Sequence, residues 1–228
     1  MRRTATTTQA LLGGLTAVLL AACSPGLGGG DTEDPGAQPA APRAQEPAPG
    51  RFSSLPEPCG AVPAETLREL LPGGAAEDYA GEPRVTYDTG RRVGCSWGTV
   101  DGADAYRLAI GMLRVVSYDP AVSDDDQAER DFEERATDAG IPADAPAEGA
   151  LAPRMLEGIG QIAYVDDRLI ASDGGPTREI DLTFRSANVI VTVQYAVSTS
   201  APDAVPESEP LQQRAGTVAR RLADGFDA

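Results

Sequence analysis

Residues 180–195 read IDLTFRSANVIVTVQY, and this stretch decides the fold. Apolar and polar side chains alternate over 180–185, and they alternate again over 189–195 after the short link Ser186–Asn188. A period of two is typical of a strand that buries one face. Two such runs joined by a tight link predict an antiparallel β-hairpin.

Other parts of the chain show weaker patterns of the same kind. Strands are predicted at 84–87, from Cys95 onward, from Tyr106 toward Tyr118, and as a hairpin-like pair (162–164 and 169–170) around Asp166-Asp167. Helices are predicted from Ala64 to Leu71, from Ser123 to a stop at Gly140, and from Leu211 to Phe226. Helices and strands do not alternate regularly, so we expect an α+β fold, one domain with an antiparallel sheet of about five to seven strands and packed helices.

The first residues form a different kind of segment. Two arginines precede the apolar run 10–20, which is shorter than the roughly 20 residues that span a bilayer. The run ends in Leu20-Ala21-Ala22-Cys23, which we interpret as a lipobox. We expect residues 1–22 to be a lipoprotein signal peptide and Cys23 to be the acylated N-terminus. The alternative is an ordinary secretory signal with an unrelated cysteine.

The next segment differs from both the signal and the rest of the chain. Residues 23–58 are rich in Pro, Ala and Gly and contain almost no large apolar side chain, so we expect a disordered linker. Residues 59–228 are expected to form the globular domain. An N-terminus with two or three acyl chains holds a protein stably on a membrane. The expected location is therefore the extracytoplasmic face of the cell membrane, with that membrane as a partner.

The chain is acidic and lacks two residue types. The formal net charge is −16, and all 19 basic residues are arginine, without any lysine or histidine. This balance offers no basic surface for nucleic acid, so no nucleic-acid partner is expected. Without histidine or lysine, Ser-His-Asp and Ser-Lys catalysis, Cys-His nucleophiles and Schiff-base chemistry are all excluded.

Three short motifs that suggest chemistry are interpreted as structural. Gly94–Gly98 fits the G-x-S-x-G nucleophile pattern, but no histidine exists to activate the serine. Gly158–Ala163 fits G-x-G-x-x-A, yet a strand pattern follows where a dinucleotide site needs a helix. Asp124–Asp126 lacks the spacing of a calcium loop and suits the start of a helix. We therefore predict no catalytic residue, no metal site and no cofactor.

Two cysteines remain once Cys23 is assigned to acylation. Thiols outside the cytoplasm tend to oxidise, so Cys59 and Cys95 are expected to form a disulfide. The alternatives are two free thiols or a metal pair. A zinc site is disfavoured because there is no histidine and the spacing is not C-x-x-C.

Several of these features together resemble a known family. They are the lipobox, the Pro/Gly linker, Pro58-Cys59 ahead of VPAETLRELL, Gly94-Cys95-Ser96-Trp97, and Gly158–Tyr164 before further strands. The chain resembles actinobacterial secreted lipoproteins of the domain-of-unknown-function 3558 type. It is more loosely similar to extracytoplasmic sensor domains of actinobacterial kinases. The resemblance implies a Cys59–Cys95 pair, a non-catalytic α+β domain without established activity, and a core or cleft position for Trp97.

The leading functional hypothesis is a membrane-anchored lipoprotein that binds or senses an envelope ligand. Trp97, Tyr164 and Arg168 are the predicted ligand-binding residues, and the alternative for them is two core aromatics and a surface arginine. A second hypothesis is an envelope glycan hydrolase, which needs two carboxyl groups facing one cleft. A third is an accessory protein that docks on another envelope protein, which requires a large exposed apolar patch.

Overall fold

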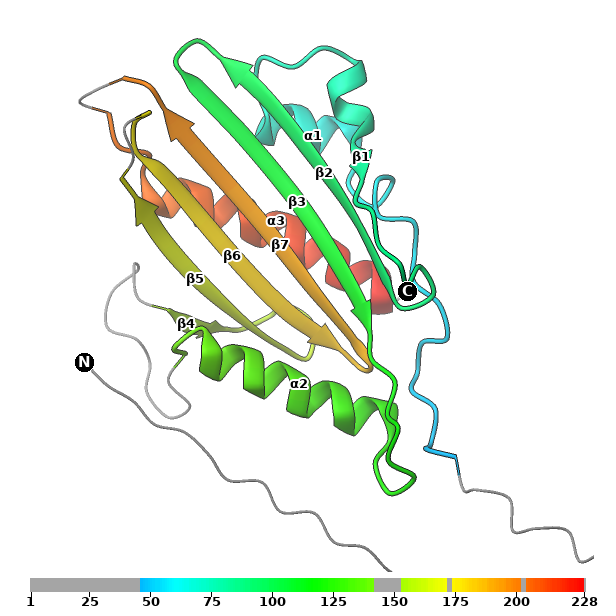
Figure 1. Cartoon of the computed structure of the whole chain (residues 1–228). Helices are drawn as coiled ribbons and strands as arrows, with labels where there is room; N and C mark the ends of the chain where they lie inside the picture. The colour runs from blue at the N-terminus through cyan, green and yellow to red at the C-terminus, as the bar shows by residue number, and fades with distance from the viewer. Residues whose placement is uncertain (1–45, 142–152, 172–173, 202–203, 228) are drawn as a thin grey trace, which may run out of the picture. The chain divides into compact units, whose positions relative to one another are not determined.

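The computed structural model describes residues 46–141, 153–171, 174–201 and 204–227 (Figure 1). The signal peptide, Cys23, the linker up to residue 45 and the loop 142–152 lie outside the described residues. The elements are α1 (Ala64–Leu70), the 3-10 helix η1 (Glu77–Ala80), β1 (Glu82–Pro83), β2 (Arg92–Asp101), β3 (Asp104–Arg114), α2 (Asp124–Asp138), β4 (Arg154–Leu156), β5 (Ile162–Ile170), β6 (Thr177–Ser186), β7 (Val189–Thr199) and α3 (Ser208–Asp227).

The seven strands form one antiparallel sheet in the order β1-β2-β3-β7-β6-β5-β4. The predicted hairpin is its centre, since β7 pairs along its whole length with β6 on one side and with β3 on the other. The link is only Ala187-Asn188, with Ala187 at a positive φ of 49°. The expected α+β class is therefore confirmed.

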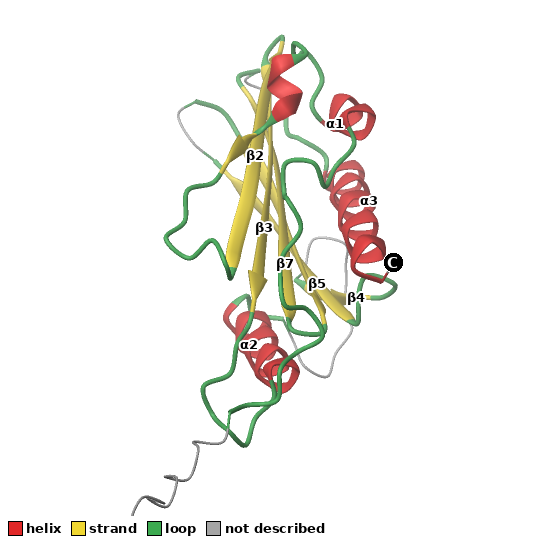
Figure 2. Cartoon of the chain, turned by 90° about the vertical axis from the view of Figure 1, so that its right-hand side faces the viewer, coloured by secondary structure: helices red, strands yellow, loops and turns green. Residues whose placement is uncertain are grey.

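One face of the sheet carries the main core, covered by α3 and α1 (Figure 2). The apolar positions predicted for the last helix are all buried: Leu211, Ala215, Val218, Ala219, Leu222 and Phe226. They meet the inward-facing side chains of the central hairpin, including Ile180, Leu182, Phe184, Val191 and Val193. Burial of this much apolar surface is the main stabilising contribution to the domain.

The opposite face is covered only at one end. There α2 packs Ala128, Phe132 and Ala136 on Ile190 and Tyr164 in a smaller cluster. The Ser123 hydroxyl accepts a hydrogen bond from the backbone N–H of Asp126 at 3.1 Å, which confirms the predicted helix cap. Past α2 this face of the sheet has no helix on it among the described elements (Figure 2).

The ordered chain begins earlier than the sequence suggested. Residues 46–58, expected to be disordered linker, lie against the domain, and Phe52 and Leu55 pack on the main core. The Asn188 side chain bonds the N–H and the C=O of Phe52, both at 2.9 Å. Gly50 N–H donates to buried Asp124 at 3.1 Å. A few anchoring contacts of this kind order a segment whose composition alone predicts disorder.

Cys59 and Cys95 form the expected disulfide, across a sequence separation of 36. It joins the segment before α1 to β2 on the core side of the sheet. Closing a loop of this length contributes about 2–4 kcal/mol by restricting the unfolded chain.

Two of the predicted strands differ from the structure. The strand expected at 84–87 is replaced by β1 at Glu82–Pro83, because the chain leaves the sheet after Arg84 and exposes Val85 and Tyr87 fully. The expected hairpin-like pair around Asp166-Asp167 is instead the single strand β5. Its two aspartates point to opposite faces, and buried Asp167 pairs with Arg178 at 2.6 Å. Tertiary partners therefore replaced the turn that two adjacent aspartates suggest.

Tyr195 links the central strand to both helices of the core face. Its hydroxyl donates to the Leu70 carbonyl at 2.6 Å, at the end of α1, and accepts from Arg214 of α3 at 3.3 Å. Burial raises the pKa of Tyr195 above its ordinary value, and Arg214 opposes this rise. The neutral phenol is therefore the form that the fold stabilises.

Tyr195→Phe should lower the free energy of unfolding by about 1–3 kcal/mol at pH 7, because the Leu70 carbonyl loses its partner. The folded-state pKa lies above the unfolded value of about 10, so rising pH deprotonates the unfolded chain first and wild type loses stability there. The gap between wild type and variant should narrow above pH 10 in urea unfolding curves. A gap that is constant from pH 7 to pH 11 contradicts this.

Candidate functional site

The uncovered part of the sheet is the candidate functional surface, called the open face below. Strand register places side chains on it in cross-strand rows. One row is Gly94, Gly111, Thr192 and Thr183, and it continues to Tyr164 under α2. The next row is Ser96, Ala109, Gln194, Asp181 and Asp166, and the third is Gly98, Arg107, Ala196, Glu179 and Arg168. The open face therefore carries mostly small residues over β2 and β3 and charged residues over β5 and β6.

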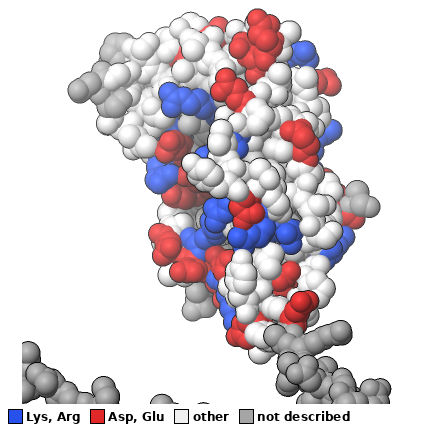
Figure 3. Space-filling view, turned by 45° about the vertical axis from the view of Figure 1, so that its right-hand side comes forward, with Lys and Arg blue, Asp and Glu red and all other residues white. Residues whose placement is uncertain are grey.

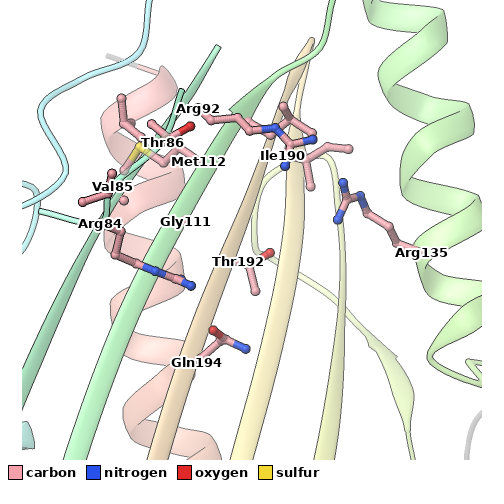
Figure 4. A pocket seen from close by; sticks show the side chains of 13 residues that line it. Arg84, Val85, Thr86, Arg92, Gly111, Met112, Arg135, Ile190, Thr192 and Gln194 are labelled. Carbon is pink, nitrogen blue, oxygen red and sulfur yellow. The ribbon is translucent and has the colours of Figure 1, made fainter. Parts of the chain in front are cut away.

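A hollow of about 350 Å³ lies at the β2–β3 end of this face. Its floor includes Gly94 and Gly111, and Thr192 and Gln194 form its side toward β7. Three arginines, Arg84, Arg92 and Arg135, surround it, and we call it the arginine hollow. They come from the segment after β1, the start of β2 and the last turns of α2, and Figure 4 shows the three side chains reaching toward its centre.

These three arginines differ from those that are paired with acidic side chains. Arg91, Arg168 and Arg178 each contact a carboxylate. Within the described ranges, Arg84, Arg92 and Arg135 have neither a salt bridge nor a side-chain hydrogen bond, and no Asp or Glu lines the hollow. Figure 3 shows basic side chains around a hollowed part of the surface, with acidic side chains between them. The charged residues that line the hollow itself are all arginines, so it is locally positive in an acidic protein.

A second hollow follows along the same strands. Ser96, Gly98, Arg107 and Ala109 form its floor, and acidic residues from η1 and β1 form its edge: Glu77, Asp78 and Glu82. The two hollows are neighbours because Ser96 and Ala109 are the next residues on this face after Gly94 and Gly111. Together they form a depression along β2 and β3 with a positive end and a mixed end.

The structure does not bring the three predicted ligand residues together. Trp97 is 4% exposed, belongs to the main core beneath the sheet and only borders the second hollow. Tyr164 lies on the face that carries the hollows, but at the end that α2 covers, with its ring centroid 5.3 Å from that of Phe132. Arg168 is on the open face but contacts Asp166, Glu179 and Asp181. Both aromatics have core positions, and the arginine is neutralised by its neighbours.

Both glycine motifs have structural positions. Gly94–Gly98 runs inside β2, where Cys95 is in the disulfide and the Ser96 hydroxyl donates to the Glu82 carbonyl at 3.4 Å. A nucleophile elbow needs a sharp strand-to-helix turn, which this segment lacks. Gly158–Ala163 leads into β5 rather than into a helix. The described elements also include no helix with the length and hydrophobicity required to traverse a bilayer.

Sequence reasoning missed the arginine hollow. Arg135 follows Arg84 by 51 residues and Arg92 by 43 residues, so no local motif contains all three. The pair Arg91-Arg92 was a signal, but its two members separate in the structure. Arg91 turns to Asp88, at 2.6 Å, and to the Tyr118 hydroxyl, at 2.7 Å, whereas Arg92 faces the hollow.

The fold and the hollow define a class of protein: an α+β domain with one closed and one open sheet face. Comparison with family models then gives a match over residues 18–153 to the family described as protein of unknown function (DUF3558). The chain belongs to this family. Arg84, Arg92 and Arg135 lie within the matched residues, whereas Thr192 and Gln194 do not. A search of curated proteins gave no match.

Arg168→Gln should lower the free energy of unfolding by about 1 kcal/mol at low salt, because Asp166, Glu179 and Asp181 lose their shared counter-charge. High salt screens the remaining repulsion, so the loss should shrink in 1 M NaCl. Urea unfolding at both salt concentrations measures this. Arg107→Gln is the matched control, an open-face arginine in the same cross-strand row. Equal effects of the two variants contradict a structural role for Arg168.

Proposed function

We propose that this protein is a lipid-anchored, extracytoplasmic binding protein that takes up an envelope ligand on its open face without converting it. The observation that carries the proposal is the arginine hollow, with its three unpaired guanidinium groups on an otherwise uncovered sheet. Within the described residues none of the three guanidinium groups has a salt bridge, so all three are available to meet an anion.

The anchoring part of the proposal rests on the N-terminal sequence. The lipobox at Leu20–Cys23 supplies an acylation site, and two or three chains hold a protein stably on a membrane. The disulfide supports the same location, since such bonds persist mainly outside the cytoplasm. The segment from Cys23 to the first described residues then acts as a spacer between the membrane and the domain.

The hydrolase alternative has one observation in its favour. Asp166 and Asp181 face each other across β5 and β6 on the open face. Arg168 contacts both, and neither lines the arginine hollow. A glycosidase needs two carboxyl groups that face a cleft able to hold the substrate, whereas these two are held by Arg168 outside the arginine hollow. We therefore place binding before hydrolysis.

Cys23→Ala should move the protein from the membrane fraction to the soluble extracellular fraction and abolish incorporation of an alkyne-labelled fatty acid. The reason is that Cys23 is the only cysteine that follows the apolar signal run directly. Ser24→Ala, the neighbouring substitution, should stay membrane-bound and labelled. Wild-type protein that takes up no fatty acid refutes the anchor.

Gly111→Phe should block ligand binding on the open face. A Cβ at Gly111 would meet no atom within 4 Å, so the ring extends into the hollow without disturbing the sheet. Gly225→Phe on α3 is the control, because a Cβ there also meets no atom within 4 Å and α3 covers the other face.

The assay uses the chain from Ser24 onward, which contains every described residue. Thermal shifts are measured with fractionated envelope extract, and the incubated fractions are analysed by mass spectrometry. We expect a shift with wild type and the control, none with Gly111→Phe, and unchanged ligand masses. Binding that survives Gly111→Phe contradicts the proposed surface, and new cleavage products support the hydrolase instead.

A further inference from the structure

We propose that the arginine hollow is a phosphate site, with Arg84, Arg92 and Arg135 as the clamp on a phosphate group of the ligand. This inference rests on the proposed binding function and names the chemistry that the hollow recognises. The phosphate could belong to a soluble sugar phosphate or to a phospholipid headgroup, and these two sources share the same contact chemistry.

The positive charge of the hollow has no internal partner. Arginines without a carboxylate partner also occur singly elsewhere among the described residues, as at Arg107 and Arg130, so the unusual feature is that such arginines gather in one place. Here three of them line one hollow that contains no acidic residue. Like charges repel, so bringing three guanidinium groups together costs free energy that a bound anion would offset. An anion is therefore the ligand type that this arrangement favours.

The number of donors selects among anions. A guanidinium group offers a planar fork that binds two oxygens of a carboxylate or phosphate side by side. One arginine is enough for both oxygens of a carboxylate. A phosphate monoester has three terminal oxygens and up to two negative charges, so it can engage three guanidinium groups at once. The three arginines approach the hollow from separate segments of the chain, which suits a tetrahedral group better than a planar one (Figure 4).

The walls of the hollow support this choice. Gly111 carries no side chain, and a Cβ there would meet no atom within 4 Å, so a ligand can come close to the backbone of β3. Thr192 offers a hydroxyl donor on the β7 side. A volume of about 350 Å³ also leaves room for part of the group that carries the phosphate.

The neighbouring hollow indicates how the rest of the ligand lies. Its floor continues from the arginine hollow along β2 and β3 over small or polar side chains, and Arg107 and Ser96 are exposed to it. Hydroxyl groups of a sugar, inositol or glycerol carrier find donors and acceptors there. We therefore expect the phosphate group of the ligand to lie near the start of β2 and its hydroxylated carrier to extend toward Arg107.

The test uses isothermal titration of the chain from Ser24 onward with inorganic phosphate, glucose 6-phosphate, glucose and acetate at low salt and pH 8. We expect heat from the two phosphates and none from glucose or acetate. Arg84→Gln, Arg92→Gln and Arg135→Gln should each weaken binding by about tenfold or more. Arg130→Gln is the matched control for Arg135→Gln, since both residues are exposed arginines of α2 and only Arg135 lines the hollow.

A second arm identifies the source of the phosphate. Vesicles of phosphatidylcholine with and without phosphatidylglycerol or phosphatidylinositol are floated with the same protein. Flotation that needs the anionic lipid and is lost in Arg92→Gln assigns the site to a headgroup. Binding of glucose 6-phosphate without flotation assigns it to a soluble sugar phosphate.

The outcomes separate this inference from the proposed function. If neither phosphates nor anionic vesicles bind while an envelope fraction still gives a shift that Gly111→Phe abolishes, the phosphate assignment is wrong and the binding function stands. Acetate that binds as tightly as phosphate also overturns the assignment. Equal losses of phosphate affinity in Arg130→Gln and Arg135→Gln would show a general charge effect and contradict a direct contact between Arg135 and the phosphate. If no fraction and no phosphate binds, both proposals fail.

Discussion

The fold depends on one buried amide at the tip of the central hairpin. Asn188 is completely buried, and its side chain bonds both backbone groups of Phe52 at 2.9 Å. Its backbone carbonyl accepts from Val115 at 2.8 Å, where the chain leaves β3 toward α2. Three segments far apart in the sequence thus meet at a single residue. A buried amide with all its groups satisfied stabilises one arrangement, because any shift leaves a polar group unpaired.

A second polar cluster fixes the other end of the core. Buried Arg178 donates to Asp167 and to the Pro206 carbonyl, and Asp167 also accepts from Ser208 and Gln212 at the start of α3. The hydrophobic face of α3 can slide along a sheet at little cost, but this cluster fixes its axial position. At the far end of α3, Phe226 meets Phe52 edge-on. The core face is therefore closed along its length, which leaves the open face as the one available for a ligand.

The sequence patterns predicted those elements that interactions between nearby residues determine. The period-two runs gave the hairpin, the apolar spacing gave α3, and the cysteine count gave the disulfide. The failures at Asp166-Asp167 and at residues 46–58 share one cause, since both segments are held by partners more than ten residues away. The prediction of the ligand-binding residues failed for the same reason. Trp97 and Tyr164 were chosen as aromatics that could bind, but strand register sends each into a core, and the arginine hollow exists only after folding.

The open face distributes its charge in a way that explains how an acidic protein can offer an anion site. Over β5 and β6, three carboxylates surround Arg168, so that part of the face is net negative. Over β2 and β3, small residues leave three guanidinium groups without acidic neighbours. The net charge of −16 repels anions at long range, but salt at physiological strength screens this within about 8 Å. Contact groups then decide the balance, and in the hollow these are all cationic or neutral. Local arrangement, rather than total charge, therefore determines what this face can bind.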